Sequence, residues 1–199
     1  MKKLALLMFV LLVLTAVSAF GQASQWVVGV KAHGGVPVGD FNTAASFGVG
    51  GTVWWGYMFD PNGTVTLRSG YLRFSGKDLN FSLLGVTGTA KTNIGVIPIV
   101  AGIRYFFMPG DTRVYGAAEA GLYLLNASTD VTVTGGGLTA AGSASTNTSK
   151  FGVNPMLGVQ FKAGDKMNVD LHGAYSVVFT DVSNTSWVDF GLGLEWMLQ

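Results

Sequence analysis

The stretch 187–196, WVDFGLGLEW, alternates between large apolar side chains and Gly or acidic side chains. One parity holds Val188, Phe190, Leu192, Leu194 and Trp196, and the other holds Asp189, Gly191, Gly193 and Glu195. Successive side chains of a β-strand point to opposite faces. The pattern therefore predicts a strand with one apolar face and one face of glycines and carboxylates.

The same alternation recurs upstream and predicts eight strands in all. A membrane-spanning strand needs about 9–11 residues, and every one of these segments is long enough. They cover residues 25–35, 47–59, 64–74, 93–107, 113–126, 150–162, 167–180 and 187–198.

Connections of two lengths alternate between these strands. Residues 60–63, 108–112 and 163–166 are short and contain Gly with Asp, Asn or Pro, which form turns readily. The other connections are longer: 36–46, 75–92, 127–149 and, less so, 181–186. Short turns on one side and long loops on the other are the plan of an outer-membrane barrel, with the short turns in the periplasm.

The longest connection, 127–149, allows two interpretations. It is rich in Ser, Thr, Gly and Ala, which is typical of a flexible surface loop, and such a loop could bind a surface ligand. Alternatively, the alternation over 131–134 continues the preceding strand beyond the membrane, and Gly135–Gly137 turns it back.

Composition favours a membrane barrel. Only 12% of the chain is charged, about half the usual share for a soluble domain, and 29 of its 199 residues are Gly. Beyond the N-terminal segment no apolar run approaches the roughly 18 residues of a membrane helix. Only helices and closed barrels satisfy their backbone polar groups in lipid, so a barrel remains. The absence of Cys excludes disulfides, thiolate metal sites and an acylated anchor.

The first 23 residues are predicted to be a secretory signal peptide. Lys2 and Lys3 precede an apolar run over 4–17, and cleavage is expected after Ala19 or Ala23. An uncleaved anchor is the alternative, but the run is short for a spanning helix. Without those two lysines, 10 of the 12 basic residues remain against 11 acidic ones. Nothing in this balance indicates a nucleic-acid partner.

The apolar faces are expected to touch lipid, since burying the charges of the other faces in a dry soluble core would be costly. Aromatic residues near strand ends would form two girdles. The periplasmic girdle would contain Trp26, Tyr57, Phe59, Tyr105, Phe107, Phe161 and Trp196, and the outer one Phe47, Tyr71, Phe151 and Phe179. Tyr115 and Tyr123 have the opposite parity and are expected to point inward.

The same parity predicts a charged lumen. Eight strands leave an interior just wide enough for side chains to fill. We therefore expect ion-paired side chains to plug it, with Arg104 pairing with Glu119 on the next strand; a gated proton or ion path is the alternative. The predicted lumenal residues are Lys31, His33, Arg68, Arg104, Glu119, Asp170, His172, Asp189 and Glu195.

No chemistry of an active or metal site is evident. The two histidines lack further ligands close in sequence, so neither a metal nor another cofactor is expected. His172, Asp170 and Ser176 lie in a row along one strand, which is a poor arrangement for a catalytic triad. The sequence does not predict an enzyme.

Four segments carry a resemblance: 37–41 (PVGDF), 97–106 (IPIVAGIRYF), 115–121 (YGAAEAG) and 190–196 (FGLGLEW). With them, nearly the whole of 24–199 resembles the small outer-membrane β-barrel domain family, common in Bacteroidota-like bacteria. Such barrels often end on an aromatic residue, whereas three residues follow Trp196 here.

The resemblance implies an all-β, eight-stranded antiparallel up-and-down transmembrane barrel in the cell outer membrane. It also implies contact with outer-membrane lipid, and with periplasmic chaperones and the barrel-assembly machinery during biogenesis. The expected function is a structural or surface-interaction role. A narrow channel or transporter for small solutes, and an accessory factor for secretion or envelope biogenesis, remain alternatives.

Overall fold

The computed structural model describes residues 25–83, 86–136, 138–181 and 183–198, so the predicted signal peptide lies outside them. Nine strands and one short helix follow in the order β1 (Gln25–Val38), α2 (Phe41–Ala44), β2 (Ala45–Met58), β3 (Gly63–Gly76), β4 (Leu79–Leu83), β5 (Val86–Phe106), β6 (Thr112–Gly135), β7 (Leu138–Lys162), β8 (Met167–Val178) and β9 (Thr185–Leu198). In the described part of the chain, no helix has the length and apolarity that a membrane span requires.

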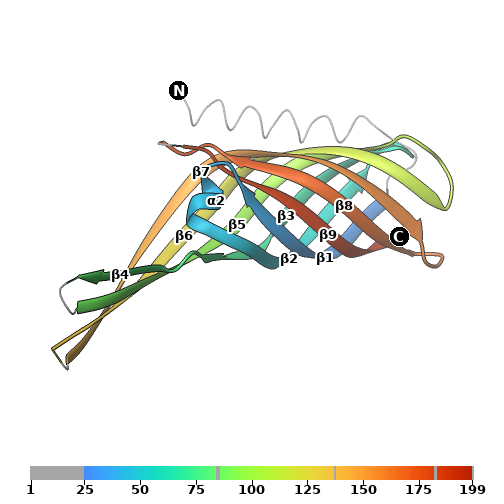
Figure 1. Ribbon diagram of the computed structural model, residues 1–199. Helices are drawn as coiled ribbons and strands as arrows, with labels where there is room; N and C mark the ends of the chain where they lie inside the picture. The colour runs from blue at the N-terminus through green and yellow to red at the C-terminus, as the bar shows by residue number, and fades with distance from the viewer. Residues whose placement is uncertain (1–24, 84–85, 137, 182, 199) are drawn as a thin grey trace.

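Eight of the strands close into an antiparallel barrel (Figure 1). β1 pairs with β2 and with the last strand, β9, while β3 pairs with both β2 and β5. The prediction of an eight-stranded antiparallel barrel is therefore confirmed. β4 is additional: it follows β3 along the same edge of β5, where Leu79 pairs with Ala90.

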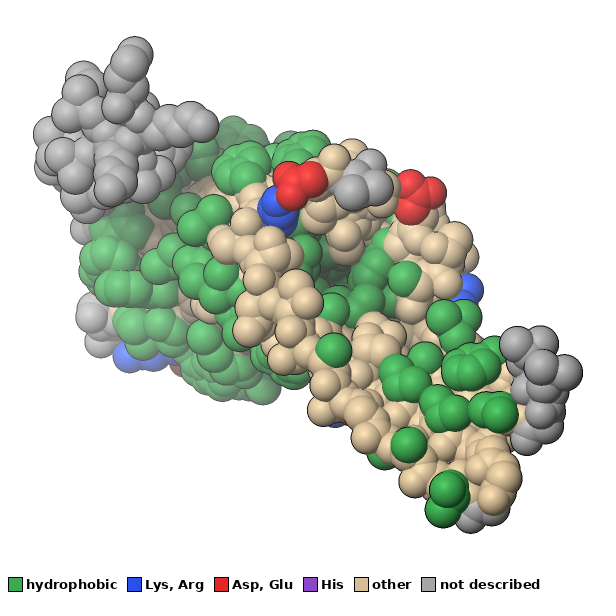
Figure 2. Space-filling model, turned by 90° about the vertical axis from the view of Figure 1, so that its left-hand side faces the viewer, with side chains coloured by type: hydrophobic (Ala, Val, Ile, Leu, Met, Phe, Trp, Pro, Cys, Tyr) green, Lys and Arg blue, Asp and Glu red, His purple; other side chains and the backbone are tan. Residues whose placement is uncertain are grey.

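Burial alternates along each barrel strand as the sequence predicted. Leu157 and Leu192 are 66% and 55% exposed on the outer wall, whereas Asp170 and Glu195 are fully buried within the barrel. Hydrophobic side chains cover the part of the wall seen in Figure 2. An apolar exterior around ionised groups is the arrangement that lipid requires.

Most of the predicted girdle aromatics lie on the outer wall. Trp26, Phe47, Tyr71, Tyr105, Phe107, Phe151, Phe161 and Phe179 are exposed there, and Tyr57, Phe59 and Trp196 are partly exposed. Tyr115 and Tyr123 are buried, in agreement with their parity.

The predicted loops 75–92 and 127–149 are instead mostly strand, which is a correction. β6 and β7 pair without interruption from the barrel out to Gly135 and Leu138. Gly136 has a φ of 58°, which glycine adopts without strain and which reverses the chain. The alternative interpretation, in which the preceding strand continues through 131–134 and is turned back by glycine, is confirmed. Its physical basis is that β6 gives residues 138–149 an unbroken ladder of backbone partners, which keeps this Ser- and Thr-rich part of β7 extended.

β4 and the extensions of β5, β6 and β7 pair into a four-stranded sheet. This sheet projects from one end of the barrel (Figure 1). We call it the distal sheet and define it by residues 79–83, 86–91, 130–135 and 138–143. It lies at the end opposite the three short turns that follow β2, β5 and β7.

Candidate functional site

The barrel lumen contains the densest group of ionisable side chains in the described part of the chain. Lys31 on β1 and Asp170 on β8 both lie opposite Gly193 of β9. A Cβ at Gly193 would overlap the Lys31 side chain, so the glycine provides the space for it. Lys31 Nζ lies 2.6 Å from Asp170 Oδ1 and 3.8 Å from Glu195 Oε1.

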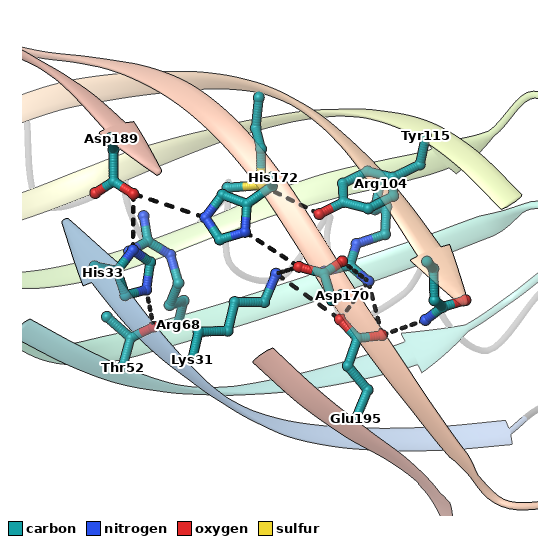
Figure 3. Close-up of polar contacts among 12 residues, drawn as sticks. Lys31, His33, Thr52, Arg68, Arg104, Tyr115, Asp170, His172, Asp189 and Glu195 are labelled. Carbon is teal, nitrogen blue, oxygen red and sulfur yellow. Dashed lines mark hydrogen bonds and ion pairs between the residues drawn. The ribbon is translucent and has the colours of Figure 1, made fainter. Parts of the chain in front are cut away.

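Arg104 on β5 reaches the same carboxylates from the other side of the lumen (Figure 3). Its Nη1 donates to Glu195 Oε1 at 2.8 Å and lies 3.9 Å from Asp170 Oδ2. The guanidinium lies over the rings of Trp54 and Tyr115, at 4.4 and 4.3 Å from their centroids. Two carboxylates and two aromatic faces thus hold this cation in a fixed position.

The predicted pair Arg104–Glu119 is wrong, because Glu119 pairs with Arg68. Arg68 Nη2 donates to Glu119 Oε2 at 2.6 Å, and Asn154 Nδ2 donates to the same oxygen at 3.1 Å. The register places Gly102 opposite Glu119. Because Gly102 has no side chain, Glu119 can lean across β5 to Arg68 on β3.

A double-mutant cycle should separate these two pairings. We expect Arg68→Met and Glu119→Gln to be coupled in the free energy of unfolding by about 1.5–3 kcal/mol, the usual size for contacting buried groups. Arg104→Met and Glu119→Gln should be nearly additive, within about 0.5 kcal/mol. Denaturant unfolding of the refolded barrel in detergent micelles measures both. Stronger coupling in the second cycle than in the first would contradict the observed pairing.

His33, His172 and Asp189 form a second group nearer the distal end. Both histidines lie opposite Gly191, His33 from β1 and His172 from β8. Asp189 Oδ1 lies 2.8 Å from His33 Nδ1 and 3.7 Å from His172 Nε2. The sequence alone did not reveal this group, because its residues come from three strands and His33 is far from the other two along the chain. The signal that could have found it is the closure of the barrel, which makes the first and last strands neighbours.

The weak candidate for a catalytic triad does not assemble. Ser176 Oγ donates to Asn154 Oδ1 at 3.1 Å, while Asp170 accepts from Lys31 and contacts His172 Nδ1 at 3.1 Å. The hydroxyl therefore lacks the contact with imidazole that a nucleophile needs.

Apolar clusters close the lumen on both sides of the charged groups. The distal cluster is built around Trp187, whose ring contacts those of Phe74 and Tyr123 at centroid distances of 5.5 and 5.9 Å. Trp54 and Phe106 belong to two clusters at the short-turn end. The cavity between Trp54, Arg104 and neighbouring side chains measures only about 10 Å³. These apolar plugs were not predicted from the sequence, although the parity of each of these aromatic residues places its side chain inside the barrel.

Comparison with solved structures finds small outer-membrane barrels. Neisserial surface protein A is 16% identical, with a TM-score of 0.56, over 86% of this chain and 96% of the other. OprG from Pseudomonas aeruginosa is 13% identical, with a TM-score of 0.55, over 89% and 97%. Ail from Yersinia pestis, in complex with the heparin analogue sucrose octasulfate, is 14% identical, with a TM-score of 0.50, over 89% and 100%.

No curated protein matches the sequence. The model of the outer membrane protein beta-barrel domain, in contrast, matches residues 9–197. The family model and the structural neighbours together assign the protein to the outer membrane of a Gram-negative cell. The chain belongs to the outer membrane protein beta-barrel domain family.

Proposed function

We propose that the protein is a surface-interaction protein: a plugged, non-enzymatic barrel that displays the distal sheet outside the cell to an apolar partner. The observation that carries this proposal is the exposed apolar face of that sheet. Leu138, Leu79 and Phe81 on this face are 79%, 69% and 49% exposed. Exposed apolar patches on folded proteins mark interaction sites far more often than isolated exposed residues do.

Register and parity separate the two faces of the distal sheet. The apolar face holds Leu79, Phe81, Val86, Gly88, Ala90, Val131, Val133, Gly135, Leu138, Ala140 and Gly142. The opposite face holds Asn80, Ser82, Thr87, Thr89, Lys91, Asp130, Thr132, Thr134, Thr139, Ala141 and Ser143. Green side chains gather on the projecting part of the molecule in Figure 2. The segregation is typical of a sheet that packs against something on one side only.

The orientation of the barrel supports display outside the cell. The connections after β2, β5 and β7 are short, and short turns of such barrels face the periplasm. The distal sheet is at the other end and would therefore extend beyond the outer leaflet.

Charge favours an uncharged, apolar partner. Lys91 and Asp130 are register partners on the polar face, and the apolar face has no ionisable residue in its described positions. The sulfated ligand in the Ail structure is a polyanion, which a basic surface would bind. This sheet has no such surface.

The filled lumen argues against the alternative function, a narrow channel or transporter for small solutes. Ion-paired side chains and aromatic clusters fill the lumen, and the small cavity of about 10 Å³ has room for no solute. In planar bilayers we expect the reconstituted protein to give no discrete conductance steps. Reproducible steps of a single size would favour a channel and contradict the plugged barrel.

Site-specific photocrosslinking in intact cells tests the display of the apolar face. A photoreactive amino acid at Leu138 should give a discrete adduct, whereas one at the adjacent Thr139, on the polar face, should not. Phe81→Ser should abolish the Leu138 adduct because it removes apolar area from the same face, and Thr89→Ala should leave it intact. Equal adducts from both faces, or none from Leu138, would contradict the proposal.

A further inference from the structure

We infer that His33, His172 and Asp189 bind one divalent transition-metal ion inside the barrel, with Zn²⁺ as the best-fitting ion. The three side chains are buried, with 5%, 7% and 4% of their surface exposed. One potential ligand atom from each lies within 4.8 Å of the others. This inference is independent of the distal sheet and of the proposed surface interaction.

Asp189 lacks the cationic partner that the other lumenal carboxylates have. Glu119 pairs with Arg68, Asp170 with Lys31, and Glu195 with Arg104. Among the described residues, Asp189 has only His33 and His172 within ion-pair distance. An ionised carboxylate in a dry interior is strongly disfavoured without a compensating charge. No Lys or Arg of the described residues lies within ion-pair distance of this carboxylate, so a cation held by the two histidines would be its nearest positive charge.

The unpaired nitrogen of His172 locates that charge. His172 Nδ1 lies 3.1 Å from Asp170 Oδ1, and because a carboxylate only accepts, the ring proton belongs on Nδ1. Nε2 of the neutral ring is then a bare acceptor. It is buried, has no hydrogen-bond partner among the described residues, and faces Asp189 Oδ1 at 3.7 Å (Figure 3). Two acceptors that face each other in this way repel unless a cation lies between them.

The separation suits a metal ion. Zn²⁺ binds His nitrogen and carboxylate oxygen at about 2.0–2.2 Å, so two tetrahedral ligands lie roughly 3.3 Å apart and more widely spread ones up to about 4 Å. The observed 3.7 Å falls within this range. An ion between His172 and Asp189 therefore requires little movement of either side chain.

His33 completes a three-ligand set. Its Nδ1 lies 2.8 Å from the same Asp189 oxygen, and its Nε2 lies 2.7 Å from Thr52 Oγ1. A Thr hydroxyl accepts as readily as it donates. Without a metal ion, the 2.8 Å contact is a hydrogen bond from Nδ1–H to the carboxylate, which only accepts. Metal binding would displace that proton and move Nδ1 and Asp189 Oδ1 about 0.5 Å apart. Nε2–H would then donate to Thr52 and leave the Nδ1 lone pair to the metal.

The outer partners are those that metal-binding histidines usually have. Each ring gives its second nitrogen to an oxygen, His172 to Asp170 and His33 to Thr52. Such contacts fix the tautomer and the orientation of the ring. Two imidazoles with one carboxylate favour zinc and related transition metals over Mg²⁺ and Ca²⁺, which prefer oxygen ligands.

Two neighbours shape the site. Gly191 lies opposite both histidines, and a Cβ there would overlap the His172 ring, so only glycine leaves the ring its place. Arg68 lies near His33 (Figure 3), but its charge is compensated by Glu119 at 2.6 Å. The charge of Arg68 therefore does not exclude a second cation between the histidines and Asp189.

The location suggests what the ion does. His33 is on the first strand and Asp189 on the last, and these strands pair to close the barrel. The ion would cross-link this seam. Because apolar clusters fill the lumen on both sides, the ion would enter while the barrel folds and leave only when it opens.

Refolding in the presence of cobalt tests the site, since Co²⁺ replaces Zn²⁺ and absorbs visible light when tetrahedrally bound. The full chain is refolded from urea into detergent micelles with CoCl₂, and free metal is removed by gel filtration. We expect about one cobalt per chain, as three protein ligands suffice for a zinc-type site. We also expect the visible bands of a tetrahedral ion, and competition by ZnCl₂ but not by MgCl₂.

Variants identify the ligands. His172→Gln, His33→Asn and Asp189→Asn should each lose bound cobalt, and Thr52→Val should weaken binding about tenfold through the His33 ring. Ser176→Ala is the matched control because it removes a buried lumenal hydrogen bond to Asn154 and no ligand. Faster migration of unheated samples in electrophoresis selects the folded variants. Two results would overturn the site: a cobalt content of the folded wild type no higher than background, or a cobalt content of the folded ligand variants equal to that of the wild type. Either would indicate that a proton on histidine compensates the charge of Asp189.

Discussion

Replacing Arg104 by Met should destabilise the folded barrel by about 3–5 kcal/mol, the usual loss when one partner of a buried ion pair is removed. Arg104 is 4% exposed and contacts both Glu195 and Asp170. Without it, Lys31 would be the one Lys or Arg of the described residues within ion-pair distance of these two carboxylates. The favourable position over the Trp54 and Tyr115 rings would be lost as well. Urea unfolding in detergent micelles measures the difference.

Two controls accompany this prediction. Arg73→Met removes an exposed arginine of β3 and should change the free energy of unfolding by no more than about 0.5 kcal/mol. Adding Glu195→Gln to Arg104→Met should recover part of the loss, because one uncompensated charge is removed with the other. A single Arg104→Met variant as stable as the wild type would show that this ion pair does not support the fold.

Trp187→Ala should cost about 3–5 kcal/mol for a different reason. The Trp187 side chain is 1% exposed and lies at the centre of the distal cluster, where its ring contacts Phe41, Phe74 and Tyr123. Closely packed strands cannot collapse around the space that the indole leaves, so the cavity adds to the loss of apolar contact. The same unfolding measurement applies.

Trp55→Ala is the matched control for Trp187→Ala. Trp55 neighbours the lumenal Trp54 in sequence but faces outward and is 50% exposed. Its removal leaves no internal cavity, so we expect a clearly smaller loss of stability. If the two tryptophan variants were equally destabilised, the distal cluster would not be the tightly packed plug described above.

In the outward extension of β5, β6 and β7, alternation along the sequence was no longer sufficient to predict the strands. Inside the membrane, alternation of apolar and polar side chains identifies each strand. In the stretch 139–149 both parities are small or polar, so alternation disappears although the strand continues. Hydrogen bonds from β6 keep this part extended, and neighbouring strands are not visible in a local pattern.

The sequence by itself determined the barrel, its eight membrane strands and the parity that divides lipid-facing from lumenal side chains. These follow from local alternation and from the requirement that every backbone polar group in lipid be paired. Only the tertiary structure decided which lumenal groups meet: Arg68 with Glu119, Arg104 with Glu195, and the two histidines with Asp189. Such pairs depend on strand register, on the glycines that let side chains lean across a neighbouring strand, and on the closure that joins β1 to β9, none of which a single strand encodes.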